Sequence, residues 1–220
     1  GTRMKSKNPK VVHKVCGKEM VNHVIDISNK SGVNDVVVIL GYGSETVKNV
    51  IPEKSIVVMQ TEQLGTGHAV KMAKDTISDE DTIVVLCGDT PLIEKETLEK
   101  LFAYHLENEY MATVLTTKVE DPTGYGRVIR DSEGNFEKIV EQKDANEEEL
   151  AVNEINSGIY CFKGDKLKEA LDLLDNNNAQ GEYYLTDTMK IIKDKGSKVG
   201  VFVGATIEEL MGVNSRVQLA

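Results

Sequence analysis

Cysteine is scarce in this sequence, and the patterns in which cysteine and histidine usually bind metals are absent. The three cysteines, Cys16, Cys87 and Cys161, show no CxxC or zinc-type spacing, and no HExxH sequence occurs. An odd, scattered set of cysteines indicates a reducing compartment rather than a disulfide framework, so we expect a cytoplasmic protein. Runs of eighteen apolar residues are also missing, and the sequence therefore predicts no membrane-spanning helix.

Two common phosphate-binding motifs are missing as well. The Gly17-Lys18 pair is followed by Glu19, where a P-loop requires serine or threonine. GYGSET, residues 41–46, follows an apolar run but lacks the third glycine of a dinucleotide-binding fingerprint. These absences exclude a P-loop NTPase and argue against a typical dinucleotide-binding protein.

The charge is unevenly distributed along the 220 residues. The net charge of −10 argues against a general nucleic-acid-binding surface. Residues 1–18 nevertheless carry one arginine, five lysines and no acidic side chain. This basic segment is either a solvated terminus or a site for a small polyanion, and composition leaves both interpretations open.

Short apolar runs alternate with helical patterns in much of the chain. Continuous runs of β-branched and aliphatic residues at 35–40, 55–59 and 82–87 are typical of parallel strands that are covered on both faces. Helices are predicted at residues 19–29, 44–51, 67–77 and 95–107. This alternation indicates a Rossmann-like α/β fold, with a mostly parallel sheet and helices on both faces.

The middle of the chain has a different pattern. Three predicted strands at 111–119, 127–130 and 136–141 are joined by the turn-rich sequences DPTGYG and DSEGN, which predicts a small antiparallel extension. The remaining predicted elements are strands at 155–162 and 199–203 and helices at 166–174 and 183–195. Because no internal repeat or low-complexity linker interrupts the pattern, we expect residues 1–220 to form a single domain.

Two stretches at predicted strand ends could bind a nucleotide and a metal. QTEQLGTGHA, residues 60–69, combines glycines that allow close backbone approach with the amide of Gln60, which could match the edge of a base. It could equally be a simple strand-to-helix turn. Asp89 follows a predicted buried strand, where a single carboxylate suits Mg²⁺ held together with substrate phosphates. Its alternative role is an N-cap for the helix after Pro91.

Three further stretches are each ambiguous alone. DPTGYGR, residues 121–127, could be a plain hairpin loop. Asn156 stands beside Gly158 within a predicted strand, and an interior glycine often marks the close approach of a ligand or of another backbone segment. Asn214 could cap a helix or present its amide oxygen to a metal.

Taken together and in order, seven stretches resemble one family. They are GTRMKSKNPK, EQLGTGHA, GDTPL, DPTGYGRV, NEINSGIY, NNNAQGEYYLTD and GVNSR. They resemble the uridylyltransferase domain of the bacterial bifunctional N-acetylglucosamine-1-phosphate uridylyltransferase/glucosamine-1-phosphate acetyltransferases, and the resemblance covers residues 1–220. It implies the nucleotide-diphospho-sugar transferase fold. It also implies synthesis of UDP-N-acetylglucosamine for peptidoglycan and lipopolysaccharide precursors, from UTP and N-acetylglucosamine 1-phosphate.

The resemblance also implies roles for particular residues. Arg3 and Lys10 match the basic residues that hold the nucleotide phosphates and the transition state. Asp89 and Asn214 match ligands of a Mg²⁺ cofactor, and both also match substrate-binding positions. The other residues that match substrate-binding positions are Gln60, Gly65 and Thr66 for the uridine, Cys87 and Gly88 at the strand end, and Gly126, Glu141 and Asn156 for the amino-sugar.

The resemblance finally sets expectations about the extent and partners of the domain. Members of the family begin with a strand leading into a glycine-rich loop, so we expect the first strand and part of that loop to be missing before GTRM. We expect no β-helical acetyltransferase domain within residues 1–220, and a largely monomeric fragment of a trimeric protein, with small-molecule substrates and neither nucleic acid nor membrane as a partner. The alternatives are a non-catalytic nucleotide-binding fragment and an enzyme for another sugar phosphate.

Overall fold

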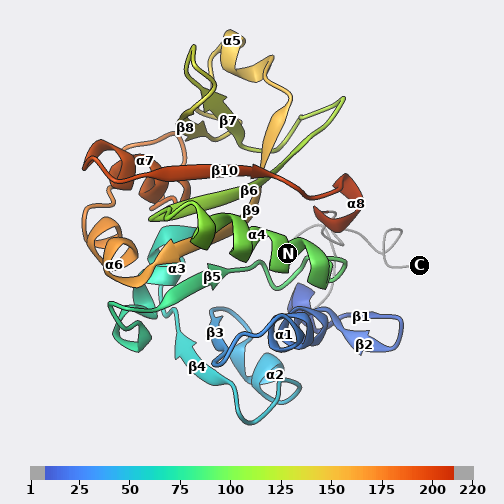
Figure 1. The fold of residues 1–220 in the computed structure, drawn as a ribbon. Helices are drawn as coiled ribbons and strands as arrows, with labels where there is room; N and C mark the ends of the chain where they lie inside the picture. The colour runs from blue at the N-terminus through green and yellow to red at the C-terminus, as the bar shows by residue number, and fades with distance from the viewer. Residues whose placement is uncertain (1–7, 211–220) are drawn as a thin grey trace.

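The computed structural model describes residues 8–210, which form ten strands and eight α-helices within that range (Figure 1). The strands are β1 Lys14–Val15, β2 Lys18–Glu19, β3 Val37–Leu40, β4 Ile56–Met59, β5 Thr82–Val85, β6 Ala112–Lys118, β7 Arg127–Arg130, β8 Phe136–Val140, β9 Glu154–Lys163 and β10 Val199–Val203. The helices are α1 Met20–Lys30, α2 Ser44–Lys48, α3 Thr66–Met72, α4 Lys95–Glu107, α5 Glu147–Leu150, α6 Gly164–Asp172, α7 Thr186–Asp194 and α8 Ile207–Leu210, with 3-10 turns η2 Lys10–Val12 and η3 Lys74–Thr76.

The strands form a mixed sheet, and the predicted α/β class is confirmed. The main sheet has the order β10-β6-β9-β7-β8, with β5 also paired to β9, while β3 and β4 form a separate parallel pair. Within residues 8–210, the other parallel pairing is β10 with β6, and the remaining pairs are antiparallel. β7, β8 and α5 make up the upper part of the molecule in Figure 1, as the predicted antiparallel extension requires.

Helices cover both faces of the main sheet because its central strand is apolar on both sides. Tyr160 and Phe162 of β9 pack into a core with side chains of α6 and α7. Ile159 and Cys161, which point to the opposite face, pack with side chains of α4. A third core joins α1 and α2 to β3.

Along one edge of β9 the pairing with neighbouring strands is interrupted, and we call this interval the break in β9. Its C-terminal half pairs with β5, from Tyr160 to Lys163, and its N-terminal end pairs with β7 at Ile155. Gly158 lies between these two pairings with φ of +78°, a conformation that glycine adopts without strain. The β9 residues between these two pairings therefore have neither β5 nor β7 paired to them on this edge.

Two predicted helices differ at their ends for identifiable reasons. The helix predicted at 67–77 ends at Met72 and continues as the 3-10 turn η3. The helix predicted at 183–195 begins only at Thr186, because the backbone of Tyr183 and Leu185 is hydrogen-bonded to the turn before α3. The helix predicted at 95–107 is confirmed as α4. In residues 8–210, no helix has the length and apolar character needed to cross a bilayer.

A buried ion pair joins β9 to β7, and it leads to a prediction about stability. Glu154 is 4% exposed and accepts hydrogen bonds of 2.8 Å from Arg130 Nε, Arg130 Nη2 and Thr116 Oγ1. Burial alone would raise the pKa of Glu154, but the hydrogen bonds and the charge of Arg130 outweigh it, and the pKa is lowered. The ionised form therefore stabilises the fold above the ordinary pKa of glutamate, and this contribution is lost as the pH falls through the lowered pKa.

We expect Glu154→Gln to reduce the free energy of unfolding at pH 7 by about 1–2 kcal/mol, at the low end for a charged hydrogen bond because Arg130 is partly exposed. The difference from the parent protein should shrink in acid, where the parent glutamate becomes protonated. Urea unfolding of both proteins at neutral pH and at about pH 3.5 measures this difference, the lower value lying below the ordinary pKa of glutamate. An undiminished difference in acid would show that the carboxylate charge is not its source.

Candidate active site

A lysine and an aspartate from distant parts of the chain meet beyond the end of β5. Lys10 Nζ lies 2.6 Å from Asp89 Oδ2, and the exposed fractions of the two side chains are 15% and 35%. Lys10 begins η2, directly after Pro9, and Asp89 stands four residues beyond Val85 at the end of β5. The two side chains thus make a partly exposed ion pair.

Asp89 does not cap the helix that follows it. The α4 helix begins at Lys95, and its N-cap is Glu94. The capping interpretation of Asp89 is therefore wrong, and its carboxylate is instead held by Lys10. Within residues 8–210, no group of three histidine, cysteine, aspartate or glutamate side chains is arranged to hold a metal ion.

Cys87 and Gly88 connect β5 to this pair. The Cys87 Sγ donates a weak hydrogen bond of 3.7 Å to the carbonyl oxygen of Gly158, at the break in β9. Burial and the neighbouring charge of Asp89 raise the pKa of the Cys87 thiol to about 12, so it stays protonated at neutral pH. Cys87 therefore packs the strand end against β9 as a neutral thiol. A Cβ at Gly88 would meet Val11 at an ordinary contact distance of 3.5 Å.

Three further predicted residues come together beside the break in β9. The backbone N–H of Asn156 donates to the carbonyl of Gly126 at 2.9 Å, and Asn156 Oδ1 accepts from Gly158 N and Tyr160 Oη at 3.0 Å each. A Cβ at Gly126 would stand 3.4 Å from both carboxylate oxygens of Glu141. Burial, followed by the charges of nearby aspartates, raises the pKa of Glu141. We call Gly126, Glu141 and Asn156 the sugar-side group, after the role that the family resemblance implies for them.

The other three predicted residues gather at the turn before α3. Gln60 Nε2 donates to the carbonyl of Gly65 at 3.1 Å and lies 3.1 Å from His68 Nδ1, so the orientation of the amide is fixed. Thr66 Oγ1 accepts the backbone N–H of Leu185 at 3.1 Å. Glycine is required at position 65, where φ is +112° and a Cβ would lie 2.5 Å from the Tyr183 carbonyl oxygen. We call Gln60, Gly65 and Thr66 the base-side group, after the role that the family resemblance implies for them.

Two predicted site residues, Arg3 and Asn214, lie outside the described residues. Their roles in phosphate and metal binding stay predictions.

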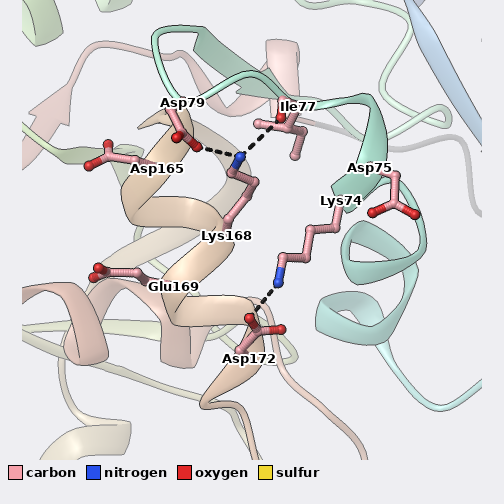
Figure 2. A pocket seen from close by; sticks show the side chains of 8 residues that line it. All are labelled: Lys74, Asp75, Ile77, Asp79, Asp165, Lys168, Glu169 and Asp172. Carbon is pink, nitrogen blue, oxygen red and sulfur yellow. Dashed lines mark hydrogen bonds and ion pairs between the residues drawn. The ribbon is translucent and has the colours of Figure 1, made fainter.

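A separate surface cleft, between η3 and α6, contains none of the predicted site residues (Figure 2). Its two lysines already pair with its own acidic side chains: Lys74 contacts Asp172, and Lys168 contacts Asp79 and the Ile77 carbonyl (Figure 2). These contacts join η3 and the following loop to α6. Since its cations are neutralised in this way, the cleft is a poor candidate for the binding of phosphates.

Several residues near the candidate site were missed by the sequence analysis. Asp144 and Asp187 are two of them, and both raise the pKa of Glu141 through their negative charge. Burial, and then the charges of Asp175 and Asp144, raise the pKa of Asp187 to about 6. Asp187 is the last residue of the motif NNNAQGEYYLTD, but nothing in the motif indicates that this aspartate lies near Glu141, at the end of β8.

The sequence model of the nucleotidyl transferase family matches residues 2–206. The chain belongs to the nucleotidyl transferase family. This nucleotidyl transferase is 73% identical over 220 residues to the bifunctional protein GlmU of Clostridioides difficile (strain 630), and 57% identical to that of Alkaliphilus oremlandii (strain OhILAs). In both cases the alignment covers 100% of the chain and 48% of the relative, so the chain spans about half their length.

Solved structures confirm the fold of this nucleotidyl transferase. A UDP-glucose pyrophosphorylase complexed with UDP-glucose superimposes with a TM-score of 0.72 at 20% identity, covering 92% of this chain and 87% of that one. An apo UDP-glucose pyrophosphorylase gives 0.76 at 18% identity, covering 95% and 91%. At these identities the likeness concerns the fold alone. The resemblance seen in the sequence motifs is confirmed by the GlmU relatives.

Proposed function

We propose that this nucleotidyl transferase makes UDP-N-acetylglucosamine and pyrophosphate from UTP and N-acetylglucosamine 1-phosphate. The observation that carries the proposal is the contact between Lys10 and Asp89, which brings a cation and a carboxylate together at the end of β5. The high identity to GlmU proteins over the whole chain supports it. A fragment without catalytic activity is not favoured, because the identity to GlmU proteins extends over the whole chain.

The reaction needs positioning and charge neutralisation more than a protein base. The phosphate oxygen of the sugar phosphate attacks the α-phosphorus of UTP, and the bond from that phosphorus to the β-phosphate oxygen breaks, so pyrophosphate leaves with the bonding electrons. A phosphate monoester with a second pKa of about 6 is already largely a dianion at neutral pH. The barrier is the repulsion between two anions, which Lys10 reduces by placing its ammonium beside the developing charge.

The residues at the end of β5 fit a Mg²⁺ ion held together with substrate phosphates. Mg²⁺ prefers oxygen ligands and is commonly held by one or two carboxylates, with phosphates and water completing its shell. Asp89 supplies a partly exposed carboxylate, and Asn214 is the second proposed ligand. When bound, the ion would neutralise charge on the phosphates of UTP. Lys10 would then exchange its contact with Asp89 for one with a phosphate.

The base-side and sugar-side groups account for the choice of substrates. Because Gln60 Nε2 donates to Gly65, the side-chain carbonyl of Gln60 is the group that can accept the N3–H of uracil, a donor that cytosine lacks. Glu141 and the backbone beside Gly126 offer acceptors for the hydroxyl and amide groups of the sugar. We also propose a cytoplasmic location, in keeping with three free cysteines.

The proposal is tested by measuring pyrophosphate release from UTP and N-acetylglucosamine 1-phosphate in the presence of Mg²⁺. We expect kcat/KM for UTP to exceed that for CTP by about 100-fold or more, because CTP would leave the Gln60 carbonyl without its donor. Glucose 1-phosphate and dTTP serve as competing substrates. If the enzyme prefers glucose 1-phosphate, then glucose 1-phosphate and not N-acetylglucosamine 1-phosphate is its sugar substrate. If no pair of nucleotide and sugar phosphate releases pyrophosphate, the proposed function is contradicted.

A further inference from the structure

The loop between α6 and α7, residues 173–185, is attached to the base-side group. The backbone N–H of Tyr183 donates to the Leu64 carbonyl, and the N–H of Gly67 donates to the Tyr183 carbonyl, each at 2.8 Å. The N–H of Leu185 donates to Thr66 Oγ1 at 3.1 Å. The end of this α6–α7 loop is therefore held along the turn that carries Gly65 and Thr66.

Two side chains of the turn after β8 attach the same loop to the sugar-side group: Lys143, whose Nζ donates to Gln180 Oε1 at 2.9 Å, and Asp144. The backbone N–H of Asp144 donates to the Glu141 carbonyl at 2.9 Å. Its Oδ1 accepts the N–H of Ala179 at 2.7 Å, and its Oδ2 accepts the hydroxyl of Tyr184 at 3.2 Å. Gln180 Nε2 donates to that hydroxyl at 2.8 Å, so the buried Tyr184 ring is held at its polar end from two directions.

We propose that Asp144 is a positioning residue, which ties the α6–α7 loop to the turn carrying Glu141 and so fixes the base-side group relative to the sugar-side group. The proposal rests on the proposed function for the identity of the two substrates. A carboxylate suits this role because its two oxygens accept from two donors five residues apart in the loop, and hydrogen bonds to a charged acceptor are stronger than neutral ones.

This arrangement affects substrate binding more than the chemical step. Asp144 lies in the turn that follows Glu141, and among the contacts described for residues 8–210 it has none with Lys10 or Asp89, the residues assigned to phosphate charge. Loosening the loop would let both groups of binding residues move, so each substrate would have to restore the geometry when it binds. The affinity of both substrates should therefore fall together.

Kinetic measurements on Asp144→Asn and Tyr184→Phe test the proposal. We expect KM for both UTP and the sugar phosphate to rise about five- to tenfold in each variant, with kcat within about twofold of the parent. Asp175→Asn is the matched control, because Asp175 lies in the same loop and, like Asp144, raises the pKa of Asp187 through its charge, but its carboxylate accepts the local N–H of Asn177 instead of a donor that ties the loop to another element. Its KM values should stay unchanged. A purely structural role would instead lower the thermal midpoint and leave both KM values unchanged, which would overturn the proposal.

The double variant Asp144→Asn/Tyr184→Phe provides a further test. Since Asp144 and Tyr184 share one hydrogen bond, the KM values of the double variant should resemble those of Asp144→Asn alone. If the increases in KM of the two single variants multiply instead, the two residues act independently and the proposal is overturned. Hydrogen exchange separates this result from a failure of the proposed function. Even if the parent protein does not turn over these substrates, Asp144→Asn must accelerate exchange at the amides of both Ala179 and Tyr183. Unchanged exchange at Tyr183 would refute the positioning role independently of activity.

Discussion

Replacement of Lys10 by alanine should lower kcat for UDP-N-acetylglucosamine formation by about 100-fold or more, the scale expected when one transition-state charge contact is removed. The free energy of unfolding should change by less than about 1 kcal/mol, because the pair with Asp89 is partly exposed and such pairs contribute little. Steady-state pyrophosphate release and urea unfolding measure the two quantities on the same preparation.

Lys14→Ala is the matched control for Lys10→Ala. Lys14 lies four residues further along, is 61% exposed and pairs with Glu19 at 3.4 Å. Its removal changes the net charge by the same amount, so a general electrostatic effect on UTP binding would appear in both variants. Lys10→Arg should stay impaired, since a planar guanidinium does not replace a compact ammonium at a single oxygen. Near-normal turnover of Lys10→Ala would contradict the role given to this residue.

Replacement of Asp89 by asparagine should nearly abolish Mg²⁺-dependent turnover, by about 100-fold or more, because the neutral amide is a much weaker ligand for a hard cation. The response of the remaining activity to added Mg²⁺ should no longer saturate in the range where the parent enzyme saturates. A second readout, independent of turnover, is the binding of Mn²⁺ in the presence of UTP, followed by electron paramagnetic resonance.

Asp172→Asn is the control for this second variant. Asp172 also pairs with lysine, but it lies in the cleft of Figure 2 among residues with no predicted role in the reaction. It should keep the Mg²⁺ response and the binding of Mn²⁺. If Asp89→Asn responds to Mg²⁺ as the parent enzyme does, Asp89 is a partner of Lys10 and not a metal ligand.

The elements of the fold were largely predictable because their signals are local. The helix at 95–107 follows from its apolar spacing, and the strands at 127–130 and 199–203 follow from their apolar content and flanking turns. The start of α7 was not predictable, because Tyr183 and Leu185 have helix-compatible neighbours and are held out of the helix by contacts with residues about 119 positions away. Tertiary contacts of this kind leave no local pattern.

The candidate site, too, was predictable where the signal is local and not where it depends on tertiary contacts. Asp89 at a strand end was recognisable as a possible metal ligand, and the family resemblance implied a role for Lys10, but nothing in the sequence predicted the contact between these two residues, 79 positions apart. The glycine at position 158, within a predicted strand, indicated the close approach of a ligand or of another backbone segment, whereas the interruption in the pairing of β9 around it is known only from the structure. The role proposed for Asp144 depends on pairing between two polar loops, and neither loop carries a hydrophobic pattern that could predict it.

The surroundings of the three cysteines have a practical consequence for spectroscopy. Cys161 is fully buried and the Cys87 thiol is kept protonated, whereas Cys16 is exposed between β1 and β2. A thiol-reactive fluorophore should therefore attach at Cys16 without any engineered substitution. Because β1 follows η2 almost directly, such a dye would sit a few residues from the lysine proposed to meet the triphosphate, and its emission could report nucleotide capture in real time.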